Sequence, residues 1–311
     1  MKLTVWGCRG SFPAPGRSTV RYGGNSTCFE VRNDAGELLI FDAGSGIREL
    51  GRALLPNMPL DGHLLISHTH WDHIMGYPFF APLHVPGNRL QIMGPPHFDH
   101  SFREVMGGPM EYSYFPVRME QLRADVTYED MNTGHYDLGQ YRVKTRPTNH
   151  PVFCLAFRVE ADGQVLVYGG DHEPYDDHVW RDREPSDHRE RAERDRFLSF
   201  VEEQNTAVID FMRDADLVIL DGTYTAVEYP ARKGWGHSTM DWCIEASIQA
   251  HVRRLLITHH EPTRTDDELD ELLAGFRADL RRRGERLEVG FATESETINL
   301  SAGQAGLAES A

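Results

Sequence analysis

Three histidines and one aspartate occur within six residues, directly after an apolar segment. The segment 63–66 has the composition of a buried strand, and the pattern HTHWDH follows it from His68 to His73. Imidazoles and a carboxylate gathered at a strand end suit borderline-soft divalent metal ions. Alternate side chains of an extended chain point the same way, so His68 and His70 can face one ion. A helical turn after them would direct Asp72 and His73 towards a second.

Three further residues complete a metal-ligand set. His150 lies at the end of an expected strand, Asp171 follows two glycines after the segment 165–168, and His259 follows the segment 255–258. Such strand-end positions hold functional side chains on a rigid scaffold beneath the loops. Each residue taken singly would be read as an ordinary polar or packing residue. Together with the histidine cluster, they predict a metal site.

The hydrophobic pattern predicts an α/β protein with two β-rich halves, each accompanied by helices. Short β-branched and apolar segments bounded by Gly, Asp or Asn predict strands, and apolar residues at helical spacing predict helices. The expected strands are 3–6, 28–31, 38–41, 63–66, 141–144, 154–159 and 165–168, with a hairpin turn at 161–163. The expected helices are 46–55, 187–215, 239–251 and 266–283.

The order of these residues, beginning with Asp42, resembles the five sequential motifs of the metallo-β-lactamase superfamily over roughly residues 1–300. The resemblance implies a single αββα sandwich domain, in which two mixed β-sheets are flanked by helices. It implies that Asp42 orients the ligands. It also implies two divalent ions, one held by His68, His70 and His150 and the other by Asp72, His73 and His259, with Asp171 bridging.

A second element, GWGHST at 234–239, precedes the helix expected at 239–251. It is similar to the RNase Z-like phosphodiesterase branch of the superfamily. The resemblance implies that His237 protonates the leaving alkoxide and that Asp221, after the preceding strand, orients it. The alternative is that His237 belongs only to a helix-capping turn in which Ser238 or Thr239 is the cap. His70 in place of the glutamate typical of the di-iron branch disfavours redox chemistry.

The N-terminal segments 6–13 and 20–26 are more narrowly similar to bacterial phosphodiesterases of small and cyclic nucleotides. Their glycine-rich turns contain Arg9, Arg21 and Asn25, which we expect to bind phosphate or to line the rim of the site. The alternative is a tight structural turn with exposed arginines.

The charge distribution bears on substrate size. The net charge is −16, and the segment from Asp171 to Asp221 supplies −9 of it, from 16 acidic residues against 7 arginines. Nucleic-acid-binding surfaces are usually basic, so an acidic insertion at about 172–210 weighs against long polyanions. We therefore expect a small phosphodiester, a cyclic nucleotide first, cleaved by a metal-bridging hydroxide whose proton passes to Asp72. The alternatives are a tRNA 3′-processing endonuclease (RNase Z-like) and an acyl or thioester hydrolase.

The remaining expectations concern metal, compartment and assembly. Zinc is the expected metal, and Mn or Fe would fit the same ligands. Apolar segments stay well short of the ~20 residues that span a bilayer, so we expect a cytoplasmic protein. The four cysteines form no CxxC pair, which excludes a thiolate zinc site of that type. The tail 301–311 is expected to be disordered, and the resemblance suggests a homodimer.

Overall fold

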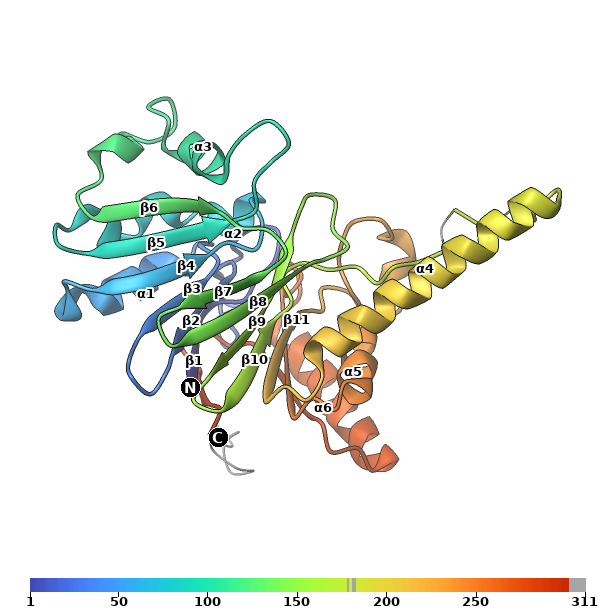
Figure 1. Cartoon of the computed structure of the whole chain (residues 1–311). Helices are drawn as coiled ribbons and strands as arrows, with labels where there is room; N and C mark the ends of the chain where they lie inside the picture. Colours follow the sequence, from blue (N-terminus) through green and yellow to red (C-terminus); the bar gives the residue numbers. More distant parts are fainter. Residues whose placement is uncertain (178, 181–182, 302–311) are drawn as a thin grey trace.

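The computed structural model describes residues 1–177, 179–180 and 183–301, and these form two seven-stranded sheets packed face to face (Figure 1). In the first sheet, antiparallel pairing at one side gives way to parallel pairing from β3 to β6. In spatial order this sheet comprises β14 (Thr297–Asn299), β1 (Lys2–Gly7), β2 (Cys28–Arg32), β3 (Leu38–Phe41), β4 (Asp61–Leu65), β5 (Arg89–Gly94) and β6 (Asp125–Asp130).

The second sheet repeats this mixture of antiparallel and parallel pairs. Its strands pair antiparallel from β7 to β10 and parallel from β10 to β13. The hairpin between β9 and β10 turns at Asp162 and Gly163, both with positive φ, which confirms the turn predicted there. The strands, in spatial order, are β13 (Glu288–Phe291), β12 (Arg254–Thr258), β11 (Leu217–Asp221), β10 (Gln164–Tyr168), β9 (Leu155–Ala161), β8 (Tyr141–Pro147) and β7 (His135–Leu138).

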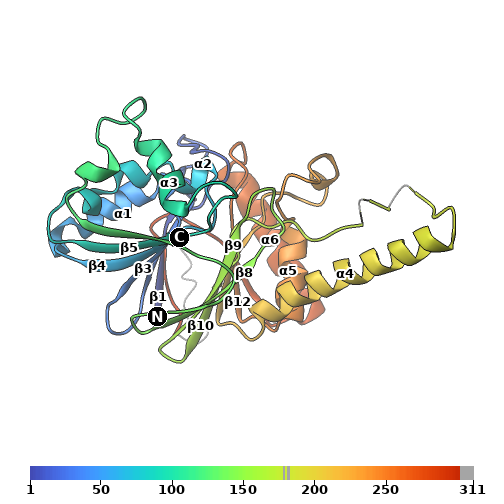
Figure 2. The same cartoon turned by 45° about the horizontal axis from the view of Figure 1, so that its top comes forward.

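Helices cover the outer face of each sheet, so the layers follow the predicted αββα order (Figures 1 and 2). Buried side chains form one core between the two sheets and one core under each helical layer. The first sheet is accompanied by α1 (Ile47–Leu54), α2 (Trp71–Ile74) and α3 (Phe102–Gly107), and the second by α4 (His188–Met212), α5 (Met240–Gln249) and α6 (Asp266–Arg283). In the part of the chain that the structure describes, no helix has the length and apolar character needed to cross a bilayer.

Aromatic side chains join the two sheets in the central core. Phe41 of β3 stacks on Phe157 of β9 with ring centroids 5.7 Å apart, and Tyr168 of β10 lies 5.2 Å from Phe41. All three side chains are buried, and burial of an aromatic side chain contributes roughly 1.5–3 kcal/mol. The four cysteines are also buried and free. This core fixes the strand ends that carry the candidate ligands.

The sequence pattern did not predict the strands that have few apolar residues. In β6 and β7 exposed polar residues alternate with partly buried ones, because both strands lie at sheet edges and face solvent. The strands β5, β13 and β14 and the helix α3 were likewise not predicted. Helix α6 has the predicted bounds, whereas α4 ends three residues before its predicted end. The predicted disordered tail falls on 302–311, outside the described residues, apart from its first residue.

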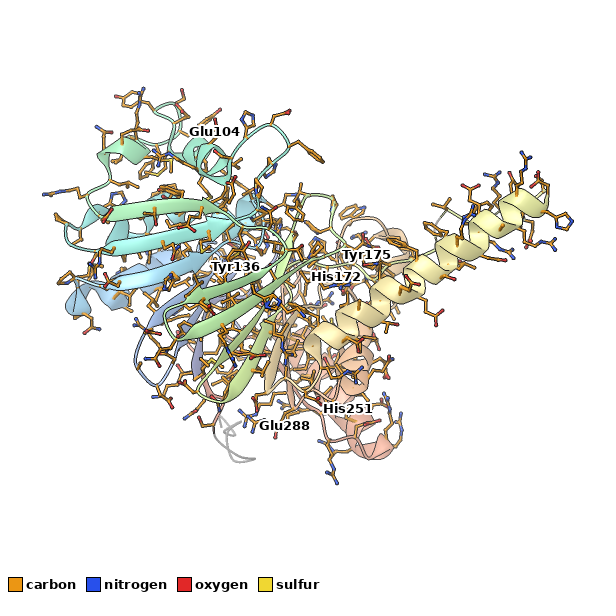
Figure 3. All side chains as sticks on the ribbon, viewed as in Figure 1. Glu104, Tyr136, His172, Tyr175, His251 and Glu288 are labelled. Atoms are coloured by element: carbon orange, nitrogen blue, oxygen red, sulfur yellow. The ribbon has the colours of Figure 1, made fainter. Side chains whose placement is uncertain are left out.

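The acidic insertion lies in the crossover between β10 and β11, which pair directly in parallel. Helix α4 fills the second half of this crossover and projects away from the sandwich (Figures 1 and 2). Asp187 caps its start by accepting hydrogen bonds from two backbone N–H groups of the first turn. At the base of the insertion, Tyr175 hydrogen-bonds Asn205 and contacts the ring of Phe200, beside His172 (Figure 3).

Candidate metal centre

The candidate ligands come together where strands of both sheets end. His68 follows β4 of the first sheet, whereas His150, Asp171 and His259 follow β8, β10 and β12 of the second. His70 to His73 form the start of α2, so the turn expected after the second histidine is present. The site thus lies at one edge of the sandwich, and each sheet supplies part of it.

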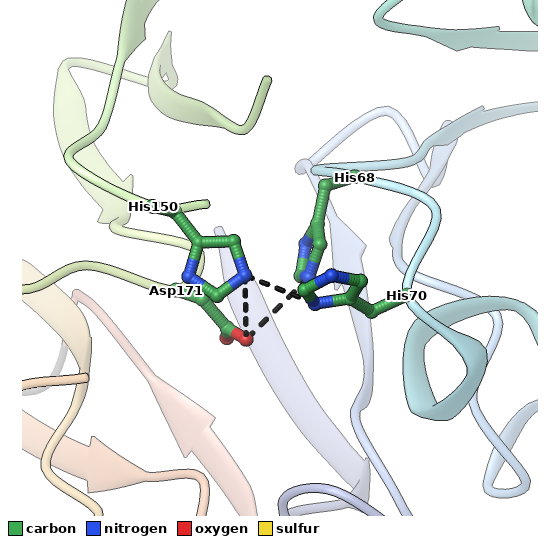
Figure 4. A group of neighbouring side chains, drawn as sticks. All are labelled: His68, His70, His150 and Asp171. Atoms are coloured by element: carbon green, nitrogen blue, oxygen red, sulfur yellow. Dashed lines mark hydrogen bonds and ion pairs between the residues drawn. The ribbon is translucent and has the colours of Figure 1, made fainter. Parts of the chain in front are cut away.

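The first cluster contains His68, His70, His150 and Asp171, whose ligand atoms all lie within 4.8 Å of one another (Figure 4). His150 Nε2 is 3.0 Å from His70 Nδ1 and 4.0 Å from Asp171 Oδ2, and His68 Nε2 is 3.5 Å from the same oxygen. Donors around one tetrahedral zinc ion, with bonds of 2.0–2.1 Å, lie about 3.3 Å apart. The spacing therefore suits a single ion.

The second cluster contains Asp72, His73 and His259. His73 Nε2 lies 3.4 Å from Asp72 Oδ2 and 3.4 Å from Asp171 Oδ1, and His259 Nε2 lies 3.2 Å from Asp72 Oδ2 and 3.4 Å from Asp171 Oδ2. The carboxylate of Asp171 thus contacts both clusters. This is the position that a bridging ligand requires.

Two buried nitrogen atoms support this assignment independently. His68 Nε2 and His73 Nε2 are fully buried, and neither has a hydrogen-bond partner within the described residues. Leaving a buried polar atom unsatisfied is unfavourable, so such atoms usually serve an unseen ligand, ion or water. His68 Nε2 faces Asp171, and His73 Nε2 faces Asp72 and Asp171. One divalent cation beside each nitrogen would satisfy it, so the residues present fit two such cations.

The ionisation of these histidines reflects the same arrangement. Burial lowers the pKa values of His68, His70 and His150, which favours the neutral imidazole that binds metal. Burial also acts to lower the pKa values of His73 and His259, but Asp171 and the other carboxylates outweigh it and raise both, to about 9 for His259. Cations bound between these carboxylates would replace the protons of both imidazoles.

The second ring nitrogen of the ligand histidines is held by a further contact. His150 Nδ1 is 2.9 Å from the carbonyl oxygen of Gly236, His259 Nδ1 is 2.8 Å from Thr223 Oγ1, and His68 Nδ1 is 3.1 Å from Ser67 Oγ. Contacts of this kind fix the ring orientation and the tautomer of a metal-binding histidine. Sequence reasoning missed all three partners, because no local pattern relates them to the ligands they support.

Asp42, to which the resemblance assigns an orienting role, contacts the candidate ligand His73. Its carboxylate is fully buried and accepts four contacts, from Ser67 N at 2.6 Å, Ser67 Oγ at 2.8 Å, His73 Nδ1 at 2.7 Å and Tyr168 Oη at 2.5 Å. The residue has φ 58°, a conformation that Asp tolerates better than most residues. Asp42 therefore holds His73 with Nε2 facing the second cluster.

His237 lies beside the clusters and is held by Asp221. Its Nδ1 is 2.8 Å from Asp221 Oδ2, and its ring stacks on that of His259 with centroids 4.6 Å apart. The side chain is 13% exposed, against at most 3% for His259 and Asp171. Thr239, whose hydroxyl accepts from the Trp242 N–H, caps α5. The capping turn is therefore present with Thr239 as its cap, and the His237 ring in addition contacts Asp221 and His259.

The three residues expected to bind substrate are engaged within the fold. Arg9 is fully buried and donates to the backbone carbonyls of Gly23 and Arg264, so it has no exposed group to offer a substrate. Arg21 binds two carboxylates at the start of α6, and Asn25 pairs with Glu294. The alternative weighed for this segment, a structural turn, therefore describes it better, although Arg9 is buried and not exposed.

The N-terminal turn reaches the site through its backbone. The N–H of Ser11 donates to Asp72 Oδ2 at 2.7 Å, and Ser11 has φ 61°. The adjacent Gly10 is required sterically, because a Cβ there would lie 2.1 Å from His259 Nδ1. The sequence did not predict this hydrogen bond from Ser11, because any residue type except proline can supply a backbone N–H donor.

Comparisons with known proteins cover nearly the whole chain. A ribonuclease Z of Thermoplasma acidophilum is 24% identical over 307 residues, which cover 86% of this chain and 88% of that protein. The structure resembles the metallo-β-lactamase fold protein YhfI of Bacillus subtilis, with a TM-score of 0.64 and 20% identity over 96% of this chain and 99% of YhfI. It also resembles the short form of human tRNase Z, with a TM-score of 0.61 and 18% identity over 97% and 100% of the two chains.

A family model described as a β-lactamase superfamily domain matches residues 38–188, which include the histidine cluster, His150 and Asp171. The family model, the ribonuclease Z relatives and the fold together support a metallo-β-lactamase superfamily hydrolase. The long ribonuclease Z matches support the RNase Z-like branch of this superfamily, which the GWGHST element predicted. The family-model match, the ribonuclease Z relatives and the His/Asp clusters indicate a metal-dependent hydrolase.

Proposed function

We propose that the protein is a phosphodiesterase with two zinc ions, in which His237 acts as the general acid. The observation that carries this proposal is the 2.8 Å contact between His237 Nδ1 and Asp221 Oδ2, beside the metal clusters. Because Asp221 occupies Nδ1, the proton available for donation lies on Nε2. A phosphodiester with a poor alkoxide leaving group needs such a donor, whereas an acyl or thioester hydrolase does not depend on it.

Besides His237, residues Asp72 and Asp221 have roles in the proposed reaction. Divalent ions, when bound, supply Lewis-acid activation of the phosphoryl group and of the attacking water. Asp72 Oδ2, which contacts the imidazoles of His73 and His259 and the N–H of Ser11, is placed to accept a proton from that water. Asp221 holds His237 and is itself held by Thr223, whose hydroxyl donates to it at 2.7 Å.

Two substrates deserve testing first. The relatives named ribonuclease Z, matched over most of both chains, support an RNA 3′-processing endonuclease and make a tRNA precursor the leading candidate. The acidic insertion between Asp171 and Asp221 favours the second candidate, a cyclic nucleotide, because it offers no basic track for a long polyanion. Both substrates use the same site and the same acid.

Turnover of both substrates by wild-type protein and by His237→Ala, with metal analysis of each, tests the proposal. We expect about two zinc ions per chain in both proteins and a loss of roughly 10²–10⁴-fold in turnover for the variant, the range of a well-placed general acid. A thioester provides the contrasting substrate. Near-wild-type phosphodiester turnover by His237→Ala would refute the acid role, and thioester cleavage insensitive to the substitution would support the acyl hydrolase alternative.

A further inference from the structure

The loop that carries His237 is held in place by one buried carboxylate. Glu173 lies two residues after Asp171 and is 7% exposed. Its Oε1 accepts from the hydroxyl of Tyr229 at 2.8 Å and from the N–H of Gly234 at 2.9 Å, and its Oε2 accepts from the N–H of Gly236 at 2.8 Å. All three donors belong to the loop between β11 and α5, so Glu173 binds that loop at several points.

The loop backbone is shaped to surround an anion. Gly234 has φ 84° and Gly236 has φ 88°, so both residues adopt a left-handed conformation. Successive N–H groups directed inward by such a backbone form a concave anion-binding nest. Among the described residues, no basic side chain forms a salt bridge with Glu173, and backbone and hydroxyl donors alone satisfy its charge.

The same carboxylate joins the segments that form the catalytic centre. Gly236 accepts a hydrogen bond from His150 Nδ1 through its carbonyl, and a Cβ at this glycine would lie 2.3 Å from that nitrogen. The backbone N–H of Glu173 donates to the carbonyl of Asn149, and the Asn149 amide donates back to the carbonyl of Glu173. Glu173 therefore connects the segments that contain Asp171, His150 and His237.

We propose that Glu173 is a positioning residue for the general acid: by fixing Gly234 and Gly236, it sets the place of His237 relative to Asp221 and the metal clusters. This inference rests on the proposed phosphodiesterase function. Without the carboxylate, two loop N–H groups and one hydroxyl lose their acceptor, and the loop is no longer held in its left-handed conformation. His237 then no longer reaches the leaving oxygen, although it retains its own chemistry.

Substitution Glu173→Gln tests this with little change of volume. A glutamine places an NH₂ group against loop N–H donors, so at least one of these contacts is lost. Bis(p-nitrophenyl) phosphate, whose nitrophenolate departs without protonation, is compared with the nucleotide substrate, tRNA precursor or cyclic AMP, that the wild-type protein cleaves. We expect a large loss on the nucleotide substrate, up to the roughly 10²–10⁴-fold of a missing general acid, little loss on the nitrophenyl ester, and unchanged zinc content.

A double substitution separates positioning from general destabilisation. If Glu173 acts through His237, adding Glu173→Gln to His237→Ala costs no further activity, because residues acting as a unit are not additive. Tyr229→Phe is the matched control, since it removes one donor and keeps the carboxylate, and it should give a smaller loss with the same substrate dependence. Equal losses on both substrates, or an additive double variant, would overturn the inference.

An NMR measurement tests whether Glu173 positions His237 without relying on enzyme turnover. In zinc-loaded protein, the His237 Nδ1 proton shared with Asp221 should give a downfield imidazole NMR signal, assigned by its absence in His237→Ala. Loss of this signal in Glu173→Gln supports the positioning role, and its retention with unchanged shift overturns it. If the wild-type protein cleaves none of the phosphodiesters, the proposed function fails. The NMR signal of the His237 Nδ1 proton then still tests whether Glu173 positions His237.

Discussion

Replacing Asp42 by asparagine is the sharpest test of how the second metal cluster is built. The introduced amide would keep one oxygen acceptor but place an NH₂ group near three present donors: the hydroxyls of Ser67 and Tyr168 and the Nδ1 of His73. The two hydroxyls can rotate and accept instead. The imidazole can accept at Nδ1 only by moving its proton to Nε2, which is the atom that faces Asp72 and Asp171.

The size of the effect follows from this forced change of tautomer. A histidine protonated at Nε2 cannot ligate there, so the second cluster loses one of its donors. Loss of an orienting partner of a metal-bound histidine typically costs 10–100-fold in metal affinity. This corresponds to about 1.4–2.7 kcal/mol, and we expect Asp42→Asn to reach at least this value, with the first cluster unaffected.

Competition with a chromophoric chelator measures the affinity of each zinc equivalent. Tyr168→Phe serves as the control, because it removes one hydrogen bond of Asp42 but leaves His73 in the same tautomer. This variant should keep both affinities and lose only about 1–3 kcal/mol of unfolding free energy. Wild-type affinity for the second equivalent in Asp42→Asn would refute the tautomer argument.

Three further outcomes are expected. Phe157→Ala should lower the unfolding free energy in urea by about 3–5 kcal/mol without changing zinc stoichiometry, because it opens a cavity against Phe41 and removes no candidate ligand. A drop below about 1 kcal/mol would show that the two sheets repack. Zinc at about 100 times its Kd should add roughly 2.7 kcal/mol of stability for each occupied site over chelator-treated protein, seen as a higher Tm. Equal Tm values would contradict a metal site in the folded state. Burial lowers the pKa of His63 below its ordinary value of 6.5, so the folded state loses stability as the pH falls below 6.5 and the unfolded chain takes up a proton there first. The variant His63→Gln should therefore lose less stability between about pH 7 and 5, by at most about 1.4 kcal/mol per pH unit. An identical pH dependence in both proteins would disprove this role of His63.

The candidate ligands could be predicted because their order along the chain follows a known motif pattern. The cluster from His68 to His73 is one segment, and His150, Asp171 and His259 each follow a strand, so the order of the motifs along the chain was enough to predict them. The support of the site depends on contacts between distant segments. Arg9, for example, donates to a carbonyl 255 residues away, and only the folded chain reveals that its guanidinium is buried and not at the rim.

The candidate acid and the residue proposed to position it differ in how visible they are in the sequence. His237 was predicted because a histidine before a helix forms part of a family motif. Glu173 was not, because its three donors lie 56–63 residues away in sequence, on a loop whose conformation depends on two glycines. Carboxylates within the acidic insertion are numerous, and nothing in the sequence distinguishes this one from its solvent-exposed neighbours.

The position of α4 has a consequence for how this protein can vary. Because β10 and β11 pair directly, Asp171 and Asp221 remain neighbours whatever the length of chain that joins them. Closing a flexible connection costs only about 0.6 kcal/mol for each doubling of its length. The outer part of the insertion is therefore a place where the chain can gain, lose or exchange residues, and with them a binding preference, while the catalytic geometry stays the same.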